Sequence, residues 1–208
     1  MIELPESTRL HRRMPKEAFY GNLQLSPIVK SAFVNDLERI YIEYGLSKEN
    51  LHLPLDSDVE VVYLMLLELK KREYDSRILE AIARQNPHRL IFLLVYEDQV
   101  QLALYQGKLY ISEWLQGSEL KLKTEGQSMR EIWDSFVEQI ALTEEEPDVQ
   151  AGLSVEERLK RQERIRKLEQ NIEKTEAAAW KEKQPHKRFE LHQRVQKLKQ
   201  ELEDLRNG

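Results

Sequence analysis

Apolar side chains recur every three or four residues in three parts of the chain, and each part is predicted to be a helix. The first begins at Ser26 and Pro27, a helix cap and a first-turn proline, and extends to Tyr44 before Gly45. The second runs from Asp75 to about Gln85 and ends before a proline. The third follows Ser128, and its apolar face consists of Ile132, Phe136, Val137 and Ile140.

Other segments lack a helical period and are rich in β-branched and apolar residues, which is typical of buried strands. Residues 59–69 form one such segment, and residues 90–96, 100–105 and 108–114 form three more with short turns between them. Residues 119–123 are expected to extend that meander. This order predicts an α+β domain, a mixed β-sheet flanked by helices.

The last part of the chain has the period of a coiled coil, with apolar positions spaced alternately by three and four residues. The positions of this seam are Ile165, Leu168, Ile172, Thr175 and Ala179, then Leu191, Val195, Leu198, Leu202 and Leu205. Paired from the outside inward, their numbers always add to 370, so the mirror point is Pro185. A proline favours a turn there. We therefore expect a C-terminal antiparallel helical hairpin.

Charge divides the chain at the same place. Residues 151–208 hold 15 of the 32 Lys and Arg and 11 of the 37 acids, so their net charge is +4. Residues 1–150 hold the other 17 Lys and Arg and the other 26 acids, so their net charge is −9. An acidic run with Pro147 and Gly152 indicates a linker between the two parts. We predict a globular domain at residues 1–142, a linker at 143–153 and the hairpin at 154–208.

Composition excludes several classes. The chain has no Cys, which excludes disulfides and thiolate metal sites and fits a reducing cytoplasm. The N-terminal residues carry Arg9, Arg12 and Arg13 without an apolar stretch, unlike a signal peptide. The longest apolar runs are about a third of the roughly 20 residues that a membrane span needs. We expect a soluble protein without a membrane contact.

The turn of the predicted hairpin is basic and carries aromatic residues. Its candidate residues for binding nucleic acid or a partner are Lys181, Lys183, Lys187, Arg188, Arg194 and Lys197, and Lys199 lies close by. Trp180, His186 and Phe189 stand among them. Such a turn is able to dock on phosphates or on an acidic partner. The alternative is a solvated spacer or oligomerisation arm.

Catalytic motifs are scarce. The five His are scattered, no phosphate-binding glycine loop occurs, and no metal site is predicted. Glu68 and Lys70 remain, because restriction-type nucleases use a Glu-x-Lys pair at a strand end to bind Mg²⁺ and activate water. Asp56 and Asp58 lie too far along one strand to share that ion, so Glu60, Asp36 or Asp98 would have to supply the third group.

Several short motifs in order resemble a bacterial domain-of-unknown-function family, DUF4391. They are residues 5–8, 14–20, 25–27, 68–75, 183–192 and 197–202. The resemblance spans nearly the whole chain. It implies a place beside methyltransferase and helicase genes of type III-like restriction and phage-defence loci, and it supplies no catalytic residues.

We therefore expect a non-catalytic accessory or adaptor subunit of a restriction-modification or phage-defence complex, which docks through its hairpin. The expected partner is a methyltransferase or helicase of the same system, nucleic acid is a second candidate at the basic turn, and no cofactor is expected. The alternative is an Mg²⁺-dependent nuclease that uses Glu68 and Lys70. A third hypothesis is a self-associating coiled-coil protein.

Overall fold

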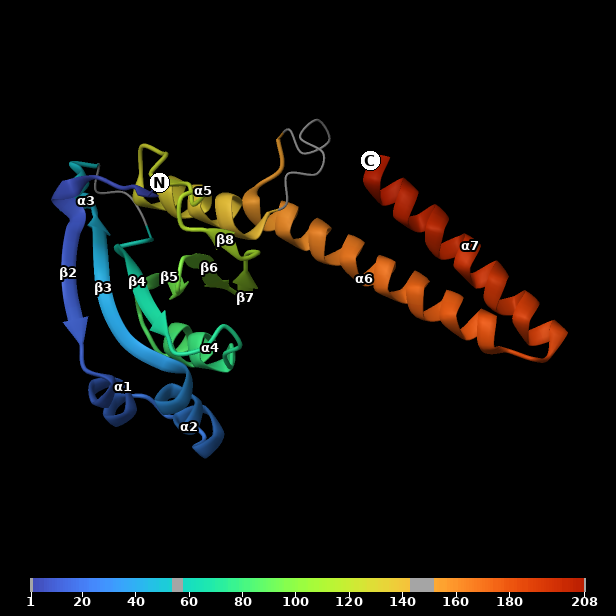
Figure 1. Ribbon diagram of the computed structural model, residues 1–208. Coiled ribbons are helices and arrows are strands. Elements are labelled where there is room, and N and C mark those ends of the chain that lie inside the picture. Colours follow the sequence, from blue (N-terminus) through green and yellow to red (C-terminus); the bar gives the residue numbers. More distant parts are fainter. Residues whose placement is uncertain (1, 54–57, 143–151, 208) are drawn as a thin grey trace. The chain divides into compact units, whose positions relative to one another are not determined.

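The computed structural model describes residues 2–53, 58–142 and 152–207. They belong to two compact units, Met1–Ala141 and Leu142–Gly208, here named the body and the tail (Figure 1). The linker predicted at residues 143–153 falls outside the described residues except for its last two. None of the described helices is both long and apolar enough to cross a bilayer.

The body alternates strands and helices. Its strands are β1 (Ile2–Glu3), β2 (Arg9–Met14), β3 (Leu37–Ser47), β4 (Val61–Leu69), β5 (Arg89–Tyr96), β6 (Gln99–Gln106), β7 (Lys108–Ile111), β8 (Leu115–Gln116) and β9 (Leu122–Lys123). Its helices are the short 3₁₀ helix η1 (Glu6–Thr8), then α1 (Lys16–Asn22), α2 (Pro27–Asp36), α3 (Lys48–Leu51), α4 (Arg77–Arg84) and α5 (Met129–Ala141).

A mixed sheet of seven strands forms the centre of the body. Its order is β2-β3-β4-β5-β6-β7, and β8 pairs with β6. Strands β4 and β5 are parallel, whereas the other neighbouring pairs are antiparallel. A parallel pair needs a crossover connection, which here contains α4. The predicted mixed sheet with flanking helices is confirmed.

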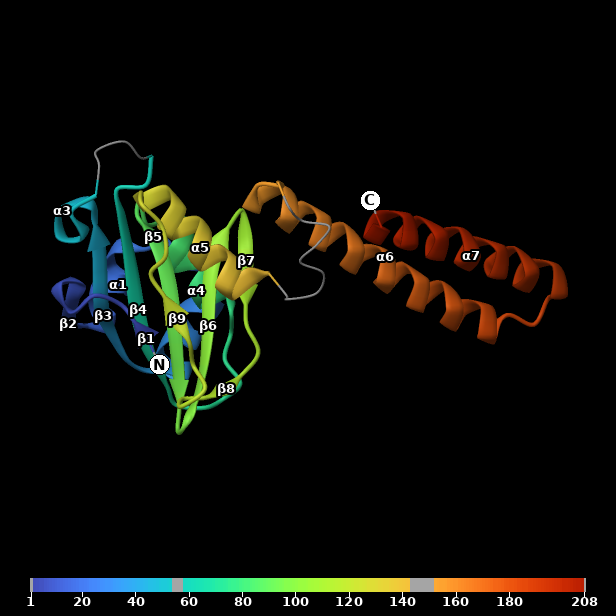
Figure 2. The same cartoon turned by 90° about the horizontal axis from the view of Figure 1, so that it is seen from above.

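Helices cover both faces of this sheet (Figure 1 and Figure 2). On one face, α2 and α4 bury Phe33 and Ile82 in a core that includes Leu90, Phe92 and Leu94 of β5. Since side chains alternate along a strand, the buried Ile91 and Leu93 face the other way. Helix α5 packs on β6 and β7 and buries a second set, Ile132, Trp133, Phe136, Val137 and Ile140. This burial on both faces explains the nearly continuous apolar runs of β5 and β6.

The first predicted helix is wrong in its second half. Helix α2 ends at Asp36, and Leu37 already has the extended backbone that begins β3. Leu37 and Ile40 fit a helical period, but they also lie in the core as strand residues. The three- and four-residue spacing therefore did not distinguish the two structures, and pairing with β4 decided between them.

The predicted fourth strand of the meander is also wrong. Residues 122–123 form β9, which pairs in parallel with the N-terminal β1 and not with the neighbouring β7. The two partners lie at opposite ends of the body's sequence, so no local pattern indicates the pairing.

The tail is the predicted antiparallel hairpin. Helix α6 spans Val155–Lys181 and begins with a capping box of Ser154 and Glu157, and α7 spans Pro185–Asn207. The two helices pack against each other (Figure 2). All ten predicted seam positions are buried or half-buried. Ion pairs between the helices join residues 164 and 201, 169 and 206, and 176 and 199. Their sums of 365, 375 and 375 lie on either side of the predicted 370.

A half-buried tyrosine makes the stability of the body depend on pH in the alkaline range. The Tyr74 hydroxyl donates to Gln101 Oε1 at 2.9 Å, and Gln101 Nε2 donates to the Ser112 carbonyl at 2.8 Å. Burial raises the pKa of Tyr74 from 10.0 to about 12.

Between these two pKa values the unfolded chain has lost a proton that the folded chain keeps, so the free energy of unfolding falls as the pH rises. Allowing for the exposed part of the ring, we expect Tyr74 to account for a loss of about 1–2 kcal/mol. Urea unfolding across this pH window should show a weaker dependence in Tyr74→Phe. An equal dependence in both proteins would contradict the assignment.

Candidate functional site

The turn end of the tail, residues 180–199, exposes two large aromatic side chains. Ala179 is fully buried in the seam, and the next residue, Trp180, is 85% exposed because the helix turns it outward. Phe189, in the second turn of α7, is 62% exposed. An exposed tryptophan is costly in water and is frequent at the centre of protein interfaces.

The connection between the two helices is short and ordered by local hydrogen bonds. The Glu182 amide donates to the Ala178 carbonyl, and the Gln184 amide donates to Glu182 Oε1 at 2.8 Å. Pro185 then begins α7. As the first residue of a helix, a proline loses no hydrogen bond, which explains its position at the mirror point of the seam.

The predicted basic residues of the turn end are all exposed. They are Lys181, Lys183, Lys187, Arg188, Arg194 and Lys197. Within the described ranges none of these six takes part in an ion pair. Lys199 differs, because its Nζ lies 2.7 Å from Glu176 Oε1. One acid of the turn end, Glu190, also has a close neighbour, because its Oε1 lies 3.5 Å from His186 Nδ1.

The rest of the hairpin has the opposite character. Arg164 pairs with Glu201 and Arg206 with Glu169 across the helices, and Lys160 pairs with Glu156 and Lys167 with Glu163 along α6. Most cations along the arms are thus paired with carboxylates, whereas the six cations of the turn end have no ion-pair partner among the described residues. Together with the two aromatic side chains, this makes the turn end a surface for an anionic partner.

The Glu68 and Lys70 pair lies where β4 ends, as predicted, but both charged groups already have partners. Arg39 Nη1 donates to Glu68 Oε2 at 3.2 Å. Lys70 Nζ donates to the Val34 carbonyl at 2.7 Å, at the end of α2.

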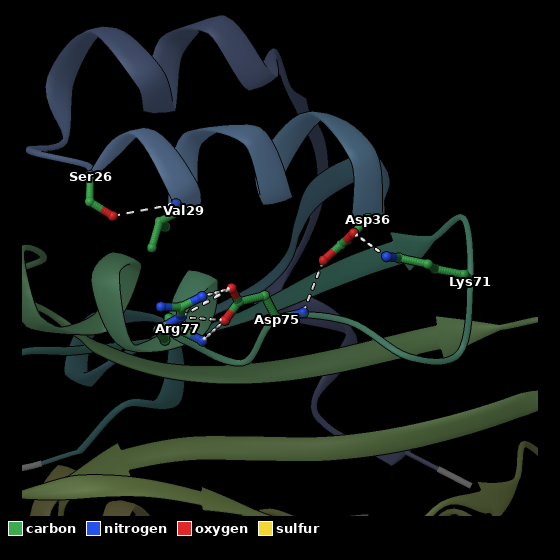
Figure 3. A network of polar contacts seen from close by, with 6 residues as sticks. All are labelled: Ser26, Val29, Asp36, Lys71, Asp75 and Arg77. Carbon is green, nitrogen blue, oxygen red and sulfur yellow. Dashed lines mark hydrogen bonds and ion pairs between the residues drawn. The ribbon is translucent and has the colours of Figure 1, made fainter.

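Asp36 is the carboxylate that the fold brings to this strand end. The Lys70 amide donates to the Asp36 carbonyl at 2.8 Å. The Asp36 carboxylate itself is only 3% exposed, and Figure 3 shows it between two partners. It pairs with Lys71 Nζ at 2.8 Å and accepts from the Asp75 amide at 2.9 Å. These contacts hold the loop after β4 against the end of α2.

Asp75 continues this network into α4. Its carboxylate accepts from the Arg77 amide at 3.0 Å and from Arg77 Nη2 at 2.6 Å (Figure 3). Hydrogen bonding to Arg77 holds the pKa of the Asp75 carboxyl below its ordinary value. The sequence predicts Asp75 as the cap of this helix; α4 begins at Arg77 with Ser76 at the N-cap position, and the Asp75 carboxylate accepts the Arg77 amide from one residue earlier.

Asp58, another candidate acid, has a partner outside this strand end. Asp58 pairs with Arg130 at 3.2 Å, and Asp56 lies outside the described residues. In the parts of the chain that the structure describes, no three His, Asp or Glu side chains are arranged to hold a metal ion.

A basic strand at the edge of the sheet was not recognised as a site from the sequence. Strand β2 exposes Arg9, His11 and Arg13. The His11 ring stacks on Tyr41, with centroids 5.3 Å apart, and its Nδ1 lies 2.8 Å from Oε2 of the buried Glu43. The cluster of basic residues at positions 9–13 was the available signal of this surface.

Comparison with known proteins identifies the family. The model of a domain of unknown function, DUF4391, matches residues 2–202. The chain belongs to this family. The DUF4391 match spans the body and nearly all of the hairpin, so the turn end lies within the family's domain. No curated protein and no solved structure matches the chain.

Proposed function

We propose that this DUF4391 protein is a non-catalytic accessory subunit that docks on a partner through the turn end of its hairpin. The observation that carries the proposal is the combination, at one end of the tail, of exposed Trp180 and Phe189 with six cations that have no ion-pair partner among the described residues. A solvated spacer would not need an exposed tryptophan, and its charges would be expected to pair along the arms as they do elsewhere in this hairpin.

The family resemblance supplies the context of the proposal. It favours a bacterial restriction-modification or phage-defence complex, with a methyltransferase or helicase as the partner. A helical hairpin with 27 residues in α6 projects its turn end about 40 Å along the helix axis, far enough to reach into a groove of a large enzyme. Aromatic and cationic side chains at that end would supply the buried centre and the charged rim of the interface.

The test is affinity capture of the tagged full chain from its native cell lysate, with and without nuclease treatment. We expect a methyltransferase or helicase to be retained in both cases. The double variant Trp180→Ala and Phe189→Ala should reduce the retained amount at least about tenfold, because aromatic residues at interface centres contribute about 2 kcal/mol or more each. A chain that ends at Pro147 should retain nothing.

A matched pair of charge variants separates the turn end from general electrostatics. Lys187→Gln with Arg188→Gln should weaken capture, whereas Lys160→Gln with Lys167→Gln, the same charge change on the ion-paired arm, should not. Equal effects of the two pairs would contradict docking at the turn end. So would capture that disappears after nuclease treatment, because nucleic acid would then be the link.

The nuclease hypothesis has weaker support, because Glu68 is paired with Arg39, Lys70 is bound to a carbonyl and the described residues hold no cluster of three ligands. Its sole favourable observation is the position of Asp36 beside the end of β4. Mg²⁺-dependent cutting by the purified chain, abolished in Glu68→Ala with the fold intact, would overturn the non-catalytic proposal.

A further inference from the structure

A cavity of about 360 Å³ lies in the body where β2 ends and α1 and β3 begin. It is lined by Arg13, Met14, Pro15, Lys16, Glu17, Glu38 and Arg39. Arg13 lies opposite Tyr41 in the sheet, and Arg39 precedes Tyr41 by two residues. Both arginines therefore project from the same face of neighbouring strands.

The cations of this cavity are only partly neutralised. Arg39 pairs with Glu68 at 3.2 Å and lies 3.8 Å from Glu38. Arg13 has no ion-pair partner among the described residues. Lys16 is half-buried, and its Nζ donates to the Leu37 carbonyl at 2.6 Å. That bond orients the ammonium group but leaves its positive charge without a carboxylate.

Burial has the largest effect on the charged state of Lys16. Burial, and then repulsion from Lys70, lower the pKa of Lys16 below its ordinary value. Glu17 and Glu38 act in the opposite direction, each less strongly than Lys70. An anion in the cavity would relieve both the burial penalty and the repulsion, which is the situation of a preformed anion site.

We propose that this cavity binds a phosphate group, which Arg13 and Lys16 hold directly. A guanidinium fork and an ammonium group complement the several oxygens of a phosphate better than they do a single carboxylate. The volume exceeds that of one phosphate and lies in the range of small-molecule sites, so the cavity has room for a larger ligand that carries the phosphate, either a nucleotide or a nucleic-acid backbone. The site is independent of the hairpin, since every residue involved belongs to the body.

The strand itself offers a matched control. Arg12 is also exposed and without an ion-pair partner in the described part of the chain, but it does not line the cavity and lies on the opposite face of the strand from Arg13. Arg12→Gln and Arg13→Gln make the same change of charge at adjacent positions. Lys16→Gln removes the charge and keeps a side-chain donor for the Leu37 carbonyl.

Isothermal titration of the full chain with inorganic pyrophosphate at low ionic strength tests the proposal, with acetate as the carboxylate comparison. We expect Arg13→Gln and Lys16→Gln each to weaken pyrophosphate binding about tenfold or more, as is typical for a charged hydrogen-bonding partner, and Arg12→Gln to leave it nearly unchanged. Equal losses in Arg12→Gln and Arg13→Gln, or pyrophosphate binding no tighter than acetate, would overturn the proposal. Circular dichroism of each variant confirms that the fold is kept.

Fluorescence anisotropy with a labelled single-stranded oligonucleotide distinguishes the two sources of the phosphate. A loss of oligonucleotide binding in Arg13→Gln and Lys16→Gln, but not in Arg12→Gln, would identify a nucleic-acid backbone. Unchanged oligonucleotide binding together with lost pyrophosphate binding would identify a free nucleotide. Neither result depends on the turn end of the hairpin, so the site is tested separately from the docking proposal.

Discussion

Replacing Asp36 by alanine is expected to lower the free energy of unfolding of the body by about 2–3 kcal/mol, as loss of a charged hydrogen-bond acceptor does. The carboxylate is 3% exposed and accepts the Asp75 amide at 2.9 Å, so its removal leaves a partly buried N–H without a partner. The Lys71 ion pair contributes less, because the Lys71 side chain is 55% exposed and its ammonium group returns to water.

Denaturant unfolding followed by tryptophan fluorescence measures this effect, since Trp114 and Trp133 belong to the body. Asp36→Asn keeps an acceptor for the Asp75 amide and should lose clearly less stability than Asp36→Ala. Lys71→Gln should change stability by less than about 1 kcal/mol. If Lys71→Gln were as destabilising as Asp36→Ala, the ion pair and not the amide bond would be the stabilising contact.

Replacing Ile172 by aspartate is expected to open the hairpin. Ile172 lies near the middle of α6, is 8% exposed and belongs to the seam between the two helices. A carboxylate at that position would be buried without a partner, at a cost of several kcal/mol. The helices of the tail are individually marginal in water, because most helical stability comes from packing of an apolar face. Opening should therefore reduce the helix content of the tail.

Spin labels on the two helices measure the opening directly. The chain has no cysteine, so Lys174→Cys and Gln196→Cys, at exposed positions of the two helices, give two specific labels. Their separation should be short and narrowly distributed in the natural background and long and broad with Ile172→Asp. The control is Asn171→Asp, the same new charge at the adjacent exposed position, which should leave the distribution unchanged. A narrow, short distance in Ile172→Asp would show that the seam does not hold the helices together.

Strands β4, β5 and β6 were predictable because their residues are buried or half-buried on both faces of the sheet. Such segments lose the alternation of apolar and polar residues, and length and β-branching then identify them. The switch from α2 to β3 was not predictable in this way. Leu37 and Ile40 satisfy either period, and the contacts that end the helix at Asp36 come from Lys71 and Asp75, far along the chain.

The candidate sites also differ in whether their residues are neighbours in the chain or are brought together by the fold. The cations of the turn end were found from the sequence because they are adjacent along the chain and centred on one proline. The phosphate cavity was not, because β2 and β3 bring Arg13 and Lys16 next to Arg39 across more than 20 residues. For Glu68 and Lys70, the spacing along the chain indicated a metal site that the described part of the fold does not assemble. Their partners in the structure are Arg39 and the Val34 carbonyl, which come from other elements.

By itself, then, the sequence determined the helical hairpin, its register and its basic turn, together with the presence of a mixed sheet between helices. Local periodicity and a single proline are sufficient for these features, since each depends on residues that are neighbours in the chain or on repeated spacing. Only the tertiary structure decided the end of α2, the pairing of β1 with β9, the burial of Asp36 and the cavity at Arg13 and Lys16. These depend on contacts between distant segments, whose free energy is gained only when the sheet assembles and which no local pattern encodes.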